Sequence, residues 1–292
     1  MNKQTFIYKV IDGCNIEADV YSTADGTMLP VIMLIHGGAL VMGSKVDVNP
    51  EQMDLYTKAG YVVISVDYRL APETKLGGII EDIQAAYGWI REKGPALLGI
   101  DPERVAVIGH SAGGYLALMM GFCVNPKPKA LISFYGYGDI GGTWYSKPDP
   151  YYSLCNPISR EDAYHDVGKG VVTDSTGTEH RNDYYLYCRQ HGLWSREVTG
   201  YDPDLEPDVI KPFCPIINIS QDYPPTLLLH GNLDTDVSYG HSALMAYQLL
   251  KKGIEHELLI VPGGEHCFDF SMGDAEVERI FSKVMQFLKK HV

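Results

Sequence analysis

A serine, an aspartate and a histidine follow one another along the chain in an order that suits nucleophilic catalysis. Ser111 is the centre of a Gly-x-Ser-x-Gly pattern that follows an apolar run at 105–108 and precedes an apolar helical run. This pattern predicts a strand, a sharp turn and a helix, because glycines on both sides leave room for a strained backbone that exposes the hydroxyl. Asp234 and His266 each follow a later apolar run. In this order the histidine can take the serine proton while the aspartate fixes the imidazole tautomer.

Backbone groups that could stabilise a developing negative charge lie near the same elements. Residues 36–39, His-Gly-Gly-Ala, follow an apolar run, and the two glycines let the backbone approach the serine closely. The amide of Ala112, immediately after the nucleophile, supplies a further donor. We therefore expect an oxyanion hole for the tetrahedral intermediate of acyl transfer.

The elements that must position these residues alternate in type along the chain. Apolar runs rich in β-branched residues predict buried strands at 31–35, 61–66, 105–108, 130–134, 226–229 and 257–261. Helical spacing of apolar residues predicts helices at 52–58, 78–93, 239–252 and 277–288. The segments 6–10 and 16–21 around Asp12-Gly13 predict a hairpin. The alternation predicts an α/β fold with a mostly parallel sheet, helices on both faces, and functional residues at its carboxyl edge.

One region does not follow this alternation. About ninety residues separate the strand predicted at 130–134 from the one predicted at 226–229, far more than an ordinary connection. We therefore divide the chain into a catalytic domain, residues 1–137 and 225–292, and an inserted region, residues 138–224. This region, called the insert below, begins at the carboxyl edge of the sheet and is expected to cap the site.

The insert is rich in tyrosine, proline and glycine. This content predicts a rigid apolar wall that prefers uncharged acyl groups of limited length. Trp144, Tyr145 and Trp194 are the aromatic side chains that we expect to line the substrate pocket. An alternative is that the insert packs to one side and forms a subunit contact, which leaves a homodimer open.

Composition narrows the classes of partner. The chain has 292 residues, of which 45% are hydrophobic and 21% charged, with a formal net charge of −13. That charge, without a cluster of lysines and arginines, argues against nucleic acid and anionic membranes as partners. The N-terminal segment has neither an apolar core nor a cleavage pattern of a secretory signal, so we expect a cytoplasmic location.

The six cysteines carry no metal or redox signature. They stand at positions 14, 123, 155, 188, 214 and 267, without Cys-x-x-Cys spacing. This spacing argues against a zinc site and against a redox pair. We expect free thiols, and a disulfide within 155–214 remains an open alternative.

On these residues the chain resembles the α/β-hydrolases, and within them the hormone-sensitive-lipase-like carboxylesterases and their relatives among bacterial feruloyl and acetyl esterases. The resemblance runs from about residue 6 to the C-terminus, apart from the insert. It rests on five segments in the family's order: HGG at 36–38, DYRLAPE at 67–73, GHSAGG at 109–114, HGNLDTDV at 230–237 and GGEHCF at 263–268.

The resemblance implies an α/β-hydrolase fold and a serine carboxylesterase. Such an enzyme would hydrolyse short-chain or aromatic acyl esters of small molecules through an acyl-enzyme, without a cofactor or a metal. By the family pattern the amides of Gly38 and Ala39 lie nearest the oxyanion, and Gly37 gives room. The family's acid is the first aspartate after the strand turn, which favours Asp234 over Asp236. Ala39 departs from the third glycine usual in the lipase-like branch, and its methyl group is expected to narrow the acyl pocket.

Four other polar residues have simpler structural interpretations. His36 and His230 end predicted strands beside glycines, where a histidine commonly forms structural hydrogen bonds. His110 lies inside the turn and points away from the nucleophile in such turns, so we expect it to pack. Arg69 is expected to tie loops together.

Three rival functions share parts of these motifs. An arylformamidase-like amide hydrolase would use the same three residues and similar glycine-rich segments. A small serine peptidase of the prolyl-oligopeptidase kind shares the serine turn, but such enzymes usually carry a propeller domain for which this chain has no room. A hydrolase-fold receptor without turnover would typically lack one of the three catalytic residues, and all three are present.

Overall fold

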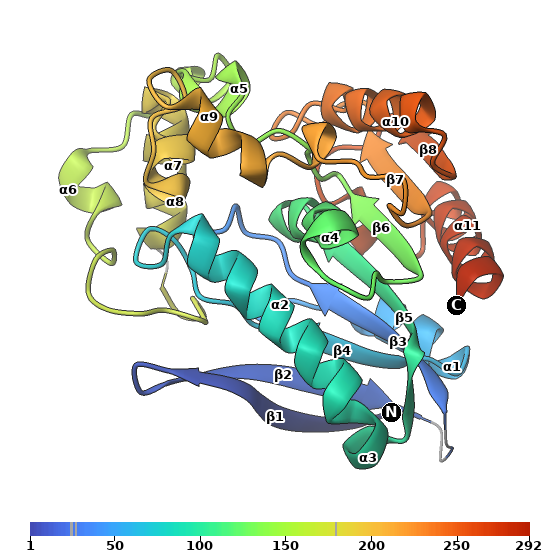
Figure 1. The fold of residues 1–292 in the computed structure, drawn as a ribbon. Helices are drawn as coiled ribbons and strands as arrows, with labels where there is room; N and C mark the ends of the chain where they lie inside the picture. Colours follow the sequence, from blue (N-terminus) through green and yellow to red (C-terminus); the bar gives the residue numbers. More distant parts are fainter. Residues whose placement is uncertain (24–25, 27, 179) are drawn as a thin grey trace.

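The computed structural model describes residues 1–23, 26, 28–178 and 180–292. Within them, eight strands form one sheet in the order β1-β2-β4-β3-β5-β6-β7-β8 (Figure 1). The strands are β1 (Asn2–Ile11), β2 (Cys14–Ser22), β3 (Leu29–Ile35), β4 (Val62–Val66), β5 (Ile100–His110), β6 (Ala130–Phe134), β7 (Thr226–Gly231) and β8 (His256–Val261). The pairs β1–β2 and β2–β4 are antiparallel, and every pair from β4 to β8 is parallel.

The sequence explains both parts of this sheet. The antiparallel edge is a hairpin whose turn residues, Asp12 and Gly13, both have positive φ (51° and 77°), as a tight two-residue hairpin turn requires. The central parallel strands are apolar, and every residue of β4 and β6 is buried. Strands covered on both faces are expected to be continuously apolar, because neither face meets water.

Helices cover both faces of the sheet. The main helices outside the insert are α1 (Pro50–Lys58), α2 (Leu76–Glu92), α3 (Gly94–Leu98), α4 (Ala112–Cys123), α10 (Gly240–Lys252) and α11 (Ala275–His291). Buried side chains of α2, α4 and α10 share one core cluster with part of the insert, while those of α1 and α11 form a second cluster on the other face. This arrangement confirms the predicted fold class.

The insert lies between β6 and β7 and holds short helices only, among the residues described. They are α5 (Thr143–Ser146), η1 (Tyr152–Leu154), α6 (Arg160–Ala163), α7 (His180–His191), α8 (Trp194–Thr199), α9 (Pro207–Ile210), η2 (Lys211–Phe213) and η3 (Pro215–Ile217). In Figure 1 the helices α5 to α9 gather at one end of the sheet. There the insert touches the loops after β3 and β4: Ser175 Oγ accepts from Gly43 N at 2.8 Å, and Leu70 N donates to Val172 O at 2.7 Å.

Two further expectations can be compared with the fold. All six cysteines lie in the described part of the chain and are free thiols, so the alternative of a disulfide within 155–214 is wrong. In that same part of the chain, no helix has the length and hydrophobicity that crossing a bilayer requires.

Candidate active site

The turn between β5 and α4 holds Ser111 in a strained backbone conformation. Its φ is 54° and its ψ is −117°, which a residue with a side chain adopts only when the surroundings enforce it. A Cβ on Gly109 would lie 1.9 Å from Gly113 O, and a Cβ on Gly113 would lie 2.1 Å from Ile35 O. Only glycine therefore fits on either side of the serine, which accounts for the Gly-x-Ser-x-Gly pattern.

Three loops at the carboxyl ends of β5, β7 and β8 bring the serine, histidine and aspartate together. His266 Nε2 lies 3.0 Å from Ser111 Oγ, and His266 Nδ1 lies 2.7 Å from Asp234 Oδ2. With Nδ1–H donating to the carboxylate, Nε2 is left as the acceptor that faces the serine hydroxyl. The geometry is that of a nucleophile, a general base and an orienting acid.

The Asp234 carboxylate is fully buried and strongly hydrogen-bonded. Its Oδ1 accepts from Asp236 N at 2.9 Å and from Val237 N at 2.8 Å. Burial disfavours the charged form, but the hydrogen bonds from His230, His266 and the backbone outweigh it, so the pKa of Asp234 lies well below its usual range. The carboxylate is therefore ionised at neutral pH.

The pKa of the His266 imidazole is shifted in the opposite direction to that of Asp234. Burial acts to lower its pKa, but the hydrogen bond to Asp234 and the negative charges of Asp236 and Asp234 outweigh burial, so the pKa of His266 is raised above the ordinary value. The same charges would stabilise the imidazolium that forms when His266 accepts a proton.

The competing acid, Asp236, takes part in a different network. Its Oδ1 accepts from Tyr152 OH and from Arg189 NH1, each at 2.9 Å, and from the hydroxyl of Tyr185. Its Oδ2 lies 3.5 Å from His266 Nε2, on the side of the ring that faces the serine. Asp234 is thus the residue that orients the ring, and Asp236 is a second negative charge next to it.

The sequence motifs did not reveal this second network. Arg189 is 1% exposed and also binds Asp149 Oδ2 at 2.7 Å. Its tyrosine partners Tyr152 and Tyr185 come, like Arg189, from the insert. The only signal was the cluster of tyrosines in the insert, and their periodicity does not say which ones face Asp236.

The loop after β3 presents backbone amides to the same space. Gly38, Ala39 and Leu40 all have positive φ, at 95°, 53° and 64°. In the described part of the chain, the N–H groups of Gly38, Ala39 and Ala112 have neither a backbone nor a side-chain acceptor. A Cβ on Gly37 would meet His110 O at 3.1 Å and Ser111 Cβ at 3.4 Å, so glycine there keeps the loop close to the serine.

A cavity of about 710 Å³ connects these groups. From outside the insert, its lining includes Ser111, His266, Gly37, Gly38 and Ala39. The insert contributes mostly hydroxyl and amide side chains, together with one leucine: Tyr152, Ser175, Thr176, Thr178, Asn182, Tyr185 and Leu186. Among the residues described, this lining carries no charged insert side chain, in line with the expectation of an uncharged wall, and its apolar surface comes from the rings of Tyr152 and Tyr185 and from Leu186. Most other aromatic side chains of the insert pack into its own core.

Trp144, Tyr145 and Trp194 are among those packed aromatics, and none of them lines the cavity. The ring centroids of Trp144 and Tyr145 are 3.4 Å apart, and those of Tyr145 and Trp194 are 3.8 Å apart. Trp194 is 0% exposed, and its Nε1 donates to Ala39 O at 2.9 Å. Of the three, only Trp194 contacts the loop beside the site, and it does so from behind the cavity wall.

His36 and His230 make structural contacts. His36 stacks on Tyr68 with centroids 4.2 Å apart, and burial lowers its pKa to about 4, so it is neutral. His230 Nε2 lies 2.8 Å from Val237 O, and its Nδ1 lies 2.7 Å from Ser242 Oγ.

His110 and Arg69 each meet a buried carboxylate. His110 borders the cavity, but its Nε2 is directed to Asp269 Oδ2, 3.2 Å away. Arg69 binds Asp82 at 2.7 Å, and because Asp82 belongs to α2, Arg69 ties the loop after β4 to a helix and not to another loop. Neither side chain is directed at Ser111.

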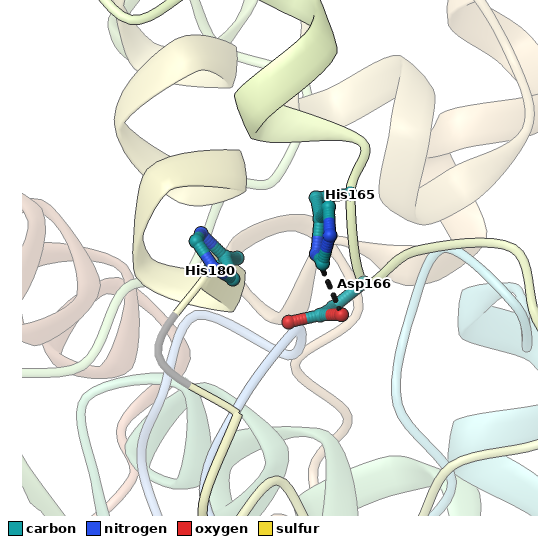
Figure 2. Close-up of side chains that lie close together, drawn as sticks. All are labelled: His165, Asp166 and His180. Carbon is teal, nitrogen blue, oxygen red and sulfur yellow. Dashed lines mark hydrogen bonds and ion pairs between the residues drawn. The ribbon is translucent and has the colours of Figure 1, made fainter.

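A separate cluster of potential metal ligands lies in the insert. His165, Asp166 and His180 offer ligand atoms that all lie within 4.8 Å of one another (Figure 2). The Asp166 carboxylate is already engaged: His165 Nδ1 lies 2.9 Å from its Oδ1, and Lys169 Nζ lies 3.4 Å from the same oxygen. None of these residues lines the 710 Å³ cavity. The cluster is therefore not part of the candidate active site.

Relatives of known sequence share the whole length of the chain. A family model described as BD-FAE matches residues 18–249. The non-reducing polyketide synthase adrD of Penicillium roqueforti is 28% identical over 342 aligned residues, which cover 100% of this chain and 14% of that protein. The chain therefore spans only a small fraction of the length of the curated relatives it matches.

Solved structures share the fold. A protein of unknown function from Staphylococcus aureus subsp. aureus Mu50 is 25% identical, with a TM-score of 0.81 over 100% of this chain and 99% of that one. An α/β-hydrolase superfamily protein from Enterococcus faecalis is 25% identical, with a TM-score of 0.77 over 99% and 98%. Because the family model covers most of the chain and the fold agrees with it, the chain belongs to the BD-FAE family of esterase-like α/β-hydrolases.

Proposed function

We propose that the protein is a serine carboxylesterase that acts on short-chain or aromatic acyl esters. Ser111 is the nucleophile, His266 the general base and acid, and Asp234 the orienting acid. The observation that carries the proposal is the continuous series of contacts from Ser111 Oγ through His266 to Asp234, at 3.0 and 2.7 Å, on the wall of a cavity large enough for a small ester. Membership of an esterase-like family supports the same reaction class.

The reaction follows from this geometry. Ser111 Oγ attacks the ester carbonyl carbon while His266 Nε2 accepts the hydroxyl proton. The carbonyl oxygen becomes negative and accepts hydrogen bonds from the amides of Gly38, Ala39 and Ala112. When the intermediate collapses, the alcohol leaves with the proton from His266, and the acyl group stays on Ser111.

The second half of the reaction repeats these roles with water. A water molecule attacks the acyl-enzyme carbonyl while His266 Nε2 takes its proton. The same amides hold the second oxyanion. Collapse returns the proton to Ser111 Oγ and releases the carboxylic acid, which restores the free enzyme.

The charge of the cavity supports uncharged substrates. Two carboxylates, Asp47 and Asp236, border it, and its described lining contains no lysine or arginine. Asp236 is paired with Arg189 at 2.9 Å, so Asp47 is the carboxylate that would repel a negatively charged substrate. We propose that residues 138–224 act as the cap of a catalytic domain formed by residues 1–137 and 225–292, because part of the insert borders this cavity.

The location is also a proposal. We propose a cytoplasmic protein, which the six free thiols support, since disulfides persist mainly in oxidising compartments.

A turnover panel tests the function. Wild-type protein and Ser111→Ala are compared on nitrophenyl acyl esters, a feruloyl ester, an acetylated sugar, an acyl thioester and N-formylkynurenine. We expect the wild type to hydrolyse one or more of the oxygen esters fastest, and Ser111→Ala to hydrolyse none. A preference for N-formylkynurenine would instead assign the protein to the amide hydrolases.

A further inference from the structure

Residues 37–40, called the oxyanion loop below, carry two of the proposed oxyanion donors. Hydrogen bonds to the carbonyl oxygens of this loop fix its peptide groups. In a trans peptide the N–H points away from the C=O, so a fixed carbonyl also fixes the direction of the amide. Gly37 O is 3.2 Å from Tyr68 OH, which aims the N–H of Gly38. Gly38 O accepts from Val41 N and Met42 N at 2.9 Å, which aims the N–H of Ala39.

The next carbonyl in the loop is held by the insert. Trp194 Nε1 donates to Ala39 O at 2.9 Å across 155 positions of sequence. Both partners are buried, with exposed fractions of 0% for Trp194 and 6% for Ala39. In an environment without water, a lost donor would leave this carbonyl unsatisfied.

Ala39 needs such a restraint because of its backbone conformation. Its φ is 53°, and the following Leu40 has a φ of 64°. Residues with a Cβ are disfavoured in this left-handed region, whereas glycine adopts it readily. Two such residues in succession give the loop a tendency to relax, and relaxation would displace Val41 N and Met42 N, the donors that hold Gly38 O and thereby the Ala39 N–H.

The indole itself is rigidly placed. Trp194 is the first residue of α8, and its ring centroid lies 3.8 Å from that of Tyr145 and 6.0 Å from that of Tyr137. The following residue, Ser195, donates from Oγ to Ile140 O at 2.7 Å. The donor is therefore fixed from the insert side.

We propose that Trp194 is a positioning residue for the oxyanion hole. Its indole N–H fixes the Ala39–Leu40 peptide, and so keeps Ala39 in the left-handed conformation on which the course of the loop through the Gly38–Ala39 peptide depends. The insert thereby acts on the chemical step as well as on access to the cavity. This inference rests on the proposed esterase function. It holds that the restraint is needed because position 39 is alanine and not glycine.

The test compares kcat and KM for nitrophenyl acetate in wild type, Trp194→Phe, Ala39→Gly and the double variant. We expect Trp194→Phe to lower kcat about 10- to 100-fold with little change in KM, less than the ~10²–10³ lost when a donor is removed outright. Ala39→Gly alone sets the reference for the double variant, because the amide at position 39 belongs to the proposed oxyanion hole. In the double variant Ala39→Gly should restore most of the lost activity, because glycine reaches the conformation without help.

The matched control is Trp144→Phe. Trp144 belongs to the same aromatic cluster, but its Nε1 donates to Asp139 O at 3.2 Å, away from the loop. We expect this variant to keep kcat. An equal loss in both tryptophan variants, full activity in Trp194→Phe, or no rescue by Ala39→Gly would overturn the proposal.

Two further measurements separate positioning from folding. Replacement of Trp194 by β-(3-benzothienyl)alanine keeps the bicyclic shape and removes only the N–H, so it serves if Trp194→Phe does not fold. A trifluoromethyl ketone that forms a tetrahedral adduct should bind the variant 10- to 100-fold more weakly, in proportion to the loss of kcat. Unchanged affinity for this inhibitor would contradict the proposal. A wild type without ester turnover would instead refute the proposed function.

Discussion

Asp234 and Asp236 stand two positions apart, and the surroundings give their carboxylates different tasks. Asp234 is buried under two backbone N–H donors and faces His266 Nδ1, whereas Asp236 is held by tyrosine hydroxyls and Arg189. The first arrangement fixes a tautomer, and the second places a charge beside the ring. Asparagine substitutions at the two positions should therefore have effects on activity that differ in size and in kind.

We expect Asp234→Asn to lower kcat by several orders of magnitude, about 10⁴-fold, because the amide favours the wrong imidazole tautomer. Asp236→Asn should cost much less. Steady-state kinetics on one nitrophenyl ester checks the ranking, and Ser111→Ala sets the floor. The reverse order would show that Asp236 is the orienting acid.

The raised pKa of His266 predicts the acid limb of the pH profile. The base must be neutral to accept the serine proton, so kcat/KM should rise with pH through a pKa above the ordinary ~6.5 of histidine. Asp236→Asn removes one of the charges that favour the protonated ring, so the limb should move to lower pH. A limb that moves to higher pH, or does not move, would show that Asp236 does not act on His266.

Motifs predicted the residues whose roles need a fixed local backbone, but not those defined only by packing. Ser111, His266 and Gly38 lie in short patterns, because a strained turn or a close approach allows few side chains. Trp194 was expected to line the pocket and lies behind the oxyanion loop instead. Its position depends on how the insert folds over the loop, and no local pattern encodes that.

At the scale of elements, β5 and α4 form a rigid support for the serine. The register Ile35↔Gly109 brings β3 and β5 together at the point where both chains turn into the site. The closeness of these backbones explains why the flanking positions tolerate only glycine.

Gly109→Ala should therefore destabilise the fold strongly. Its Cβ would lie 1.9 Å from Gly113 O, and relieving this overlap requires a backbone shift that costs at least about 2–3 kcal/mol. Gly88→Ala in α2 is the matched control, because its Cβ meets nothing within 4 Å and alanine favours a helix by about 0.5–1 kcal/mol. Urea unfolding should show opposite signs for the two variants, and equal effects would contradict the steric account.

The sequence predicted helices and strands well where buried side chains recur at regular intervals along the chain. The final helix, α11, buries Val277, Ile280, Phe281, Val284 and Leu288, as its spacing predicts. β5 begins earlier than its apolar run, at Ile100, because Ile100 pairs with Leu29 outside that run. The insert gave no comparable signal, since its short helices bury side chains against one another and against the catalytic domain without a repeating pattern.

At the scale of the whole molecule, the insert and the rest of the chain share buried contacts. Arg181 of the insert is 1% exposed and pairs with Glu73 at 2.8 Å, while its Nε donates to Val41 O. Its guanidinium also donates to Ala71 O at 2.7 Å. The cavity therefore lies between two parts of the chain that are held together by buried polar contacts.

Substrate charge should then decide turnover between esters of similar size. We expect nitrophenyl succinate to show a kcat/KM about 10-fold below that of nitrophenyl butyrate, because Asp47 and Asp236 border the cavity, with only Asp236 paired to an arginine, and the net charge is −13. Added salt should reduce this ratio by screening. Equal turnover of the two esters at low salt would show that these carboxylates do not contact the acyl group.

The most direct test of the central claim is covalent labelling by a fluorophosphonate, read by intact mass and peptide mapping. A serine activated by His266 attacks the phosphorus and displaces fluoride, so the wild type should gain one adduct, located on Ser111, with complete loss of esterase activity. Ser111→Ala should gain none and should remain folded. Labelling at another residue, or an active Ser111→Ala, would contradict the account.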